Sequence, residues 1–229
     1  MSGHTFFWLF FGLCTALIAA SIVMANIQAR RRRLALQSLA QQIGVIYQGD
    51  DWTRMRSPQL DTALFNRGGG RRFANILTGD YGGLKMDIFD YRYTVSGGKS
   101  SQTWAQTVAV FTQDHSLPCF ELRPEGFFDR VGDVFFHQDI DFDSHPVFSR
   151  RYLLRGPEPE KIRALFSPTL IALFEGLAAE DKWHIEGNGS SLILYRSNVT
   201  VDAEKIVSFR DQTSAITQGF IKACGPVTV

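Results

Sequence analysis

A long, predominantly hydrophobic segment lies near the N-terminus. Phe6–Met24 spans 19 residues, of which only Gly12, Thr15 and Ser21 lie outside the hydrophobic set. A helix of that length is roughly 28 Å long at about 1.5 Å per residue, close to the ~30 Å hydrocarbon thickness of a bilayer. Tryptophan is enriched at membrane–water interfaces, which suits the position of Trp8 near the start of the segment. The segment therefore predicts a transmembrane helix.

The pattern then changes to that of an amphipathic helix. Leu36, Leu39 and Ile43 recur at helical spacing, with glutamines between them, until Gly44. Apolar residues at this spacing occupy one face of a helix, and glycine commonly follows a helix end. We expect the helix to continue out of the membrane to Gly44.

Alternating patterns typical of strands follow. Residues 73–78, 84–95 and 102–112 are separated by two glycine-containing turns, which predicts an antiparallel meander. In the middle segment the apolar positions change parity between Ile88 and Phe89. Such a change indicates a β-bulge, or a strand buried on both sides at that point.

Strands and helices are mixed in the remaining chain. Asn188-Gly189 between two apolar runs predicts a hairpin over 183–195, and Ser167-Pro168 predicts a helix start with Ser167 as its cap. Further strands are expected at 119–123, 135–142 and 151–154, and helices at about 58–65, 161–166, 168–179 and 202–218. The fold class is α+β: an antiparallel β-meander packed with C-terminal helices, preceded by one N-terminal transmembrane helix.

This pattern divides the chain into three parts. Residues 1–29 form the transmembrane anchor, 30–49 a basic juxtamembrane helix, and 50–229 an α+β domain. About 180 residues can form one core or two small halves, with a boundary near residue 156.

Charge is distributed unevenly around this anchor. The formal net charge is +1, but residues 1–49 carry +4 and no acid, which leaves −3 for residues 50–229. This excludes a simple soluble enzyme and a nucleic-acid binder with a basic body. Basic residues follow the apolar run, so the positive-inside rule predicts a single-pass protein of the inner (cytoplasmic) membrane, its N-terminus outside and its C-terminal domain in the cytoplasm. A cleaved signal peptide or a buried core helix are the alternatives.

The charge at this boundary lies in Arg30, Arg31, Arg32 and Arg33. These arginines are a topology signal, and they are also candidate ligands for anionic lipid headgroups. A second basic motif, Gly68–Arg72, is either a flexible loop or an anion site, and it lacks the features of a P-loop.

Potential metal ligands alternate along residues 137–145. His137, Asp139 and Asp141 are the candidates for a divalent metal. The alternative is a solvated acidic face of a half-buried strand, because period two places Ile140 and Phe142 toward a core. The segment fails as a calcium loop, and the three cysteines show no zinc or disulfide spacing. We predict no cofactor.

Several sequence segments resemble a group of uncharacterised bacterial proteins that carry a single membrane anchor. They occur in the same order and cover most of residues 35–225; they are Asn75–Thr94, Gln106-Thr107-Val108, Phe120–Glu125, Asp139–Phe142 and His145–Tyr152. The group has no assigned activity, so the resemblance implies an anchored protein and no catalytic residues.

The sequence thus favours a non-enzymatic protein. The first hypothesis is a membrane-anchored cytoplasmic interaction or scaffold protein that contacts membrane lipid and a protein partner, but no nucleic acid. The second is a membrane-tethered, metal-dependent hydrolase that uses residues 137–145. The third is a lipid- or ligand-sensing module with a pocket among Phe89, Tyr91 and Tyr93, which a filled core would disfavour.

Overall fold

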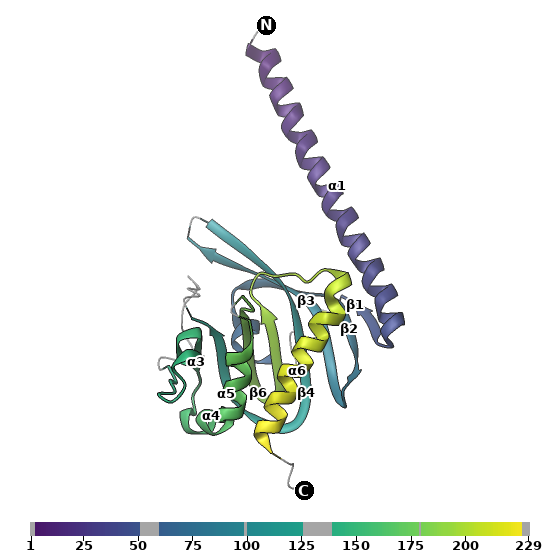
Figure 1. The fold of residues 1–229 in the computed structure, drawn as a ribbon. Coiled ribbons are helices and arrows are strands. Elements are labelled where there is room, and N and C mark those ends of the chain that lie inside the picture. Colours follow the sequence, from purple (N-terminus) through teal and green to yellow (C-terminus); the bar gives the residue numbers. More distant parts are fainter. Residues whose placement is uncertain (1–2, 51–59, 99, 126–138, 179, 226–229) are drawn as a thin grey trace.

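The computed structural model describes residues 3–50, 60–98, 100–125, 139–178 and 180–225. A long N-terminal helix projects from an antiparallel sheet that packs against C-terminal helices (Figure 1). The helices are α1 (Gly3–Ile43), α2 (Ala63–Asn66), α3 (Pro146–Arg151), α4 (Pro159–Leu165), α5 (Pro168–Gly176) and α6 (Ile206–Cys224), with a 3₁₀ turn η3 (Ala203–Lys205). The strands are β1 (Ile46–Gly49), β2 (Gly69–Tyr81), β3 (Leu84–Gly97), β4 (Ser100–Pro124), β5 (Tyr152–Arg155) and β6 (Trp183–Arg196).

Helix α1 runs without a break for 41 residues. It contains a segment that is long and apolar enough to cross a membrane. The most apolar part of that segment is not buried against the rest of the protein. The helix ends where Gly44 adopts a φ of +72°, as the sequence predicts. Among the α1 side chains that the structure describes, those of Leu36 and Ala40 in the last turns are buried in the core.

The described residues form a six-stranded antiparallel sheet of order β1-β2-β3-β4-β5, with β6 also paired to β4. The predicted meander is confirmed as β2, β3 and the first half of β4. Strand β4 spans 25 residues and pairs with β3, β5 and β6 along different parts of its length. It is therefore the central strand of the fold.

The predicted 183–195 hairpin is wrong. Residues 183–196 form one continuous strand, β6, which pairs with β4 on both sides of the Asn188-Gly189 step. Gly189 has a φ of +56° and lies where the register to β4 shifts. A glycine with positive φ occurs in β-bulges as well as in hairpin turns, and Gly189 lies at such an irregularity in the pairing of β6 with β4.

The strand predicted over 135–142 is also not observed in residues 139–142, which the structure describes. Residues 135–138 lie outside the described residues, and Asp139 makes one isolated bridge to Arg155. The helix at 168 is confirmed, since Ser167 Oγ accepts a hydrogen bond from the Leu170 backbone N–H at 3.4 Å.

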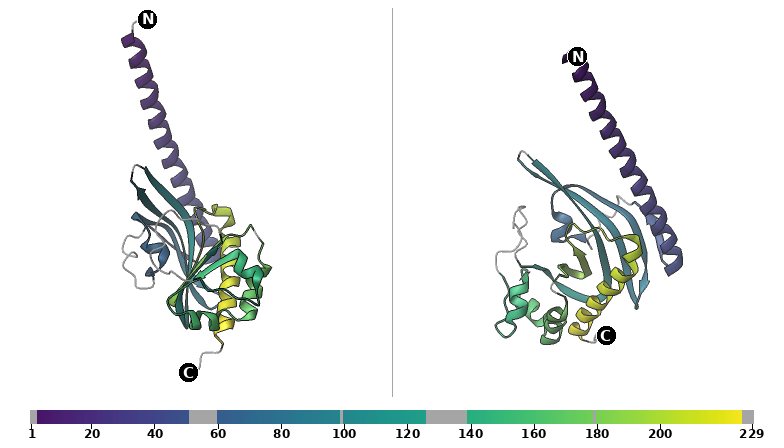
Figure 2. Two further views of the ribbon diagram at one scale, coloured as in Figure 1. Left: turned by 90° about the vertical axis from the view of Figure 1, so that its left-hand side faces the viewer. Right: turned by 45° about the horizontal axis from the view of Figure 1, so that its top comes forward.

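The parity change in β3 marks a strand buried on both faces. Met86 and Ile88 belong to a core between the sheet and the helices, whereas Phe89, Tyr91 and Tyr93 belong to a second core on the opposite face, under α2. The register of β3 to β4 stays regular, and β2 carries one extra residue between Gly69 and Arg72 and another between Ala74 and Leu77. Figure 2 shows α4, α5 and α6 gathered along one face of the sheet. The α+β class predicted above is thus confirmed.

Candidate functional site

An ion pair joins α1 to the sheet. Arg32 Nε and Nη2 donate to the two carboxylate oxygens of Asp90, each at 2.7 Å. Both side chains are only about one-fifth exposed. A two-pronged arginine–carboxylate contact fixes orientation as well as distance.

Asp90 lies on β3, two residues after Ile88, the last β3 residue of the core between the sheet and the helices. It lies on the same face of β3 as Met86 and Ile88, and Arg32 of α1 contacts it there. Its carboxylate also accepts from Asn75 Nδ2 at 2.8 Å and Thr107 Oγ1 at 3.0 Å. Four donors thus satisfy this carboxylate.

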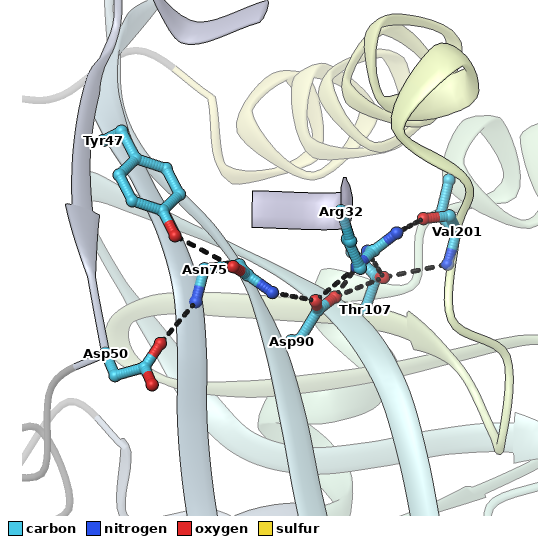
Figure 3. Close-up of polar contacts among 7 residues, drawn as sticks. All are labelled: Arg32, Tyr47, Asp50, Asn75, Asp90, Thr107 and Val201. Carbon is cyan, nitrogen blue, oxygen red and sulfur yellow. Dashed lines mark hydrogen bonds and ion pairs between the residues drawn. The ribbon is translucent and has the colours of Figure 1, made fainter. Parts of the chain in front are cut away.

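The hydrogen bonds continue outward from this pair (Figure 3). Arg32 Nη1 donates to the Val201 carbonyl at 2.7 Å, and the Val201 N–H donates to Thr107 Oγ1 at 2.9 Å. Tyr47 Oη donates to Asn75 Oδ1 at 2.9 Å, and burial raises the Tyr47 pKa, so its phenol stays protonated. We call Arg32, Tyr47, Asn75, Asp90 and Thr107 the junction cluster.

Asn75 reaches Asp90 because of local backbone geometry. It has a φ of +54° and lies in the β2 bulge between Ala74 and Leu77. Asparagine tolerates the left-handed region better than most residues, and a bulge re-aims the side chain it carries. The junction cluster therefore joins α1, β1, β2, β3 and β4, and its chemistry is that of a structural lock with no free carboxylate.

The predicted lipid-headgroup arginines face different surroundings. Arg30 and Arg31 are exposed, and Arg33 lies 3.7 Å from Asp50 with about half of each side chain exposed. Arg32 points inward to Asp90. Headgroup binding by the Arg30–Arg33 run stays a prediction.

The metal candidates are only partly within the described residues. His137 lies outside them, and the Asp139 carboxylate accepts from Arg155 Nε at 2.6 Å. The Asp141 side chain is exposed, while its backbone carbonyl accepts from Arg163. Nowhere in the described ranges do three His, Cys, Asp or Glu side chains gather as a metal site would require. The metal site stays a prediction.

A second polar cluster is buried on the other face of the sheet. The Glu186 carboxylate accepts from the Leu64 N–H at 3.0 Å and from Tyr195 Oη at 2.9 Å. Beside it, Arg67 donates to Glu121 at 2.6 Å. Burial, assisted by nearby Arg67 and Arg123, lowers the His184 pKa to about 3. These contacts hold the α2 segment against the sheet.

The aromatic residues proposed to line a sensing pocket fill this second core instead. Phe89, Tyr91 and Tyr93 are at most 2% exposed. The rings of Phe89 and Tyr91 pack with Phe65 and Phe73, for example at a centroid distance of 5.0 Å for Phe65–Tyr91, and Tyr93 packs on Tyr91 at 5.8 Å. The filled core disfavours a sensing pocket at these rings.

Sequence reasoning missed the junction cluster. The ion pair joins residues 58 positions apart, and no local spacing connects them. One signal was present: Asp90 follows Met86 and Ile88 on one strand face, where an acid needs a partner. Asn75, Asp90 and Thr107 also lie in the segments that carry the resemblance described above.

Comparison with known proteins adds a fold relationship. No family model matches the chain, and no curated protein matches it. The crystal structure of the mycobacterial trehalose monomycolate transport factor A, TtfA, is similar, with a TM-score of 0.58 and 12% sequence identity. The match covers 88% of this chain and 98% of that one. At this identity the similarity establishes the fold alone.

Proposed function

We propose that this protein is a membrane-anchored adaptor that holds its α+β domain at the cytoplasmic face of the inner membrane, where the domain binds a protein partner. The observation that carries the proposal is the junction cluster. It locks the end of an apolar helix onto three strands of the sheet. A flexible tether would only keep a domain near the membrane, whereas a locked helix also fixes which face of the domain a partner meets.

The similarity to TtfA supports the same class of role. That protein is described as a transport factor, and we extend to this chain only the general idea of an accessory protein in transport or scaffolding. The arginines after the apolar run support the orientation, because such residues favour the cytoplasmic side.

Extraction and labelling test the anchoring. We expect the protein to remain in membranes after alkaline carbonate washing. With Cys14, Cys119 and Cys224 replaced by serine, a cysteine at Ser2 should react with a membrane-impermeant maleimide in intact spheroplasts. A cysteine at exposed Asp143 should react only after the membrane is opened. The reverse labelling pattern would refute the orientation.

The partner surface is tested separately. We propose that residues 137–145 contact the partner, with exposed Asp141 and Asp143 presenting negative charge. A photo-crosslinker at Val147, which is exposed beside them, should give one discrete adduct in membranes. Asp141→Lys/Asp143→Lys should abolish it, while Glu160→Lys/Glu204→Lys, an equal charge change on exposed or half-exposed sites elsewhere, should not. An adduct that survives the first pair excludes this surface.

A further inference from the structure

A pocket of about 340 Å³ lies between α1 and the sheet, beside the junction cluster. It is bordered by α1 on one side and by strands β2, β3 and β4 on the other. The residues that matter here are Ala29, Arg33, Arg72, Ala74, Arg92 and Ala105.

Alanines create the space. Ala29 comes from α1, and Ala74 and Ala105 come from β2 and β4, on either side of β3. Ala105 is the register partner of Arg92, and Ala74 is the partner of Asp90. With only a methyl group at each of the three positions, the helix and sheet leave room for a small group near the long arginine side chains.

Arginine side chains gather in this space. Arg72 and Arg92 are direct register partners on adjacent strands, and like charges directly opposite each other are destabilising. Among the residues that the structure describes, four arginines and two aspartates line the pocket, a formal excess of +2. Arg32 and its neighbours already satisfy Asp90, and Asp50 lies beside Arg33. A bound anion would bring negative charge to the side of the pocket where Arg92 lies.

Arginine favours one kind of anion. Its planar fork matches the oxygens of a phosphate group, with two parallel hydrogen bonds. Arg92 is exposed and has no hydrogen bond or ion pair within the described part of the chain. Its guanidinium is thus available to a ligand.

The position along the anchor points to the source of the phosphate. Ala29 is the last residue of the uncharged N-terminal stretch, and Arg30 carries its first charge. Lipid phosphates lie where the apolar part of a transmembrane helix gives way to charge. We infer that this pocket binds the phosphate of an anionic lipid headgroup, with Arg72 and Arg92 as its main ligands and Arg33 at its rim.

The inference rests on the proposed membrane anchoring, but its test does not. Full-length protein purified in a neutral detergent is titrated with phosphatidylglycerol or phosphatidylcholine, and bound lipid is counted by native mass spectrometry. Failure of the carbonate or labelling experiments would refute the anchoring, and failure here refutes only the pocket.

We expect Arg72→Gln/Arg92→Gln to bind phosphatidylglycerol at least about tenfold more weakly than the wild type, a loss of about 1.4 kcal/mol. The matched control, Arg150→Gln/Lys222→Gln, removes the same charge from exposed residues on α3 and α6 and should bind normally. Equal loss in both variants, or no loss in the first, would overturn the inference. Arg92→Gln alone repeats the test with a single change should the double variant fail to fold.

Inorganic phosphate distinguishes a lipid from a soluble ligand. We expect it to bind the wild type measurably, but more weakly than phosphatidylglycerol, and to raise the melting temperature of the wild type and not that of Arg72→Gln/Arg92→Gln. If it binds through these arginines as tightly as the lipid does, the ligand is a soluble phosphate and the lipid assignment is wrong.

Discussion

Asp90 is the residue on which the junction cluster depends. Its carboxylate neutralises Arg32 and accepts from Asn75 and Thr107 as well. Removing it leaves two donors, Asn75 and Thr107, and the mostly buried Arg32 cation without their shared acceptor. A buried donor or charge left without its partner destabilises the fold by more than the intact contact stabilises it.

Asp90→Ala should therefore lower the free energy of unfolding by about 2 kcal/mol, discounted from a fully buried pair because the site is partly exposed. Denaturant titration of the full chain in detergent, followed by the fluorescence of buried Trp183, measures this loss. The control is Glu158→Ala, which breaks an exposed pair with Lys161 and should cost under about 0.5 kcal/mol. Equal losses would contradict a special role for Asp90.

His184 makes stability depend on pH. Its pKa falls to about 3 in the folded protein, because burial disfavours the charged ring. The unfolded chain takes up a proton near pH 6.5 while the folded one does not, so stability is fully present above pH 6.5 and falls as pH decreases toward 3.

We expect this residue to contribute a slope of about 1.4 kcal/mol per pH unit between pH 6 and 4. Carboxylates also titrate in this range, so the informative quantity is the difference between the wild type and His184→Gln. The variant should show a shallower slope in denaturant midpoints measured across the range, and parallel curves would argue against a neutral buried ring.

At the scale of elements, the pairing of β4 and β6 depends on close packing at one point. Gly187 is the register partner of Phe120, and a Cβ at Gly187 would lie 2.2 Å from the Phe120 ring. That ring cannot move easily, because it packs on Phe166 and Phe220 at centroid distances of 5.3 and 5.5 Å.

Gly187→Ala should consequently cost about 1–3 kcal/mol through overpacking. Gly176→Ala at the end of α5, where an added Cβ meets nothing within 4 Å, should cost nothing and can stabilise by a few tenths of a kcal/mol. Thermal unfolding of the two variants compares them, and a neutral Gly187→Ala would mean that the sheet relaxes around Phe120.

The elements that the sequence predicts well are those governed by local rules. The anchor helix, the meander and the Ser167 cap follow from apolar length, alternation and capping chemistry. The hairpin failed because the local signal at Asn188-Gly189 is the same for a turn and a bulge, and only pairing with β4 distinguishes them. The Arg32–Asp90 pair was unpredictable for the same reason, since it depends on where α1 docks.

For the whole molecule, the junction cluster fixes the angle between α1 and the sheet. Leu36 and Ala40 are each 2% exposed against the core, and Arg32 adds its ion pair one turn earlier. Leu34, on the same helix, is 55% exposed. One face of α1 therefore belongs to the domain and the other does not.

Spin labels at exposed Gln28 and Glu160 can report this geometry. We expect one narrow distance distribution in the wild type and a broad one in Arg32→Ala/Leu36→Ala, because the double variant loses both the ion pair and the apolar contact. Leu34→Ala should stay narrow. A broad wild-type distribution would show that the helix moves freely and would remove the main support for the adaptor proposal.

The central position of β4 also has a consequence for biosynthesis. One edge of this strand pairs at once with β3, which precedes it, but its other edge waits for β6, completed only at Arg196. An unpaired edge is a template for association with other chains. The nascent protein thus keeps an open strand edge until most of it has left the ribosome. Truncation before residue 183 should leave that edge permanently open and the product prone to aggregation.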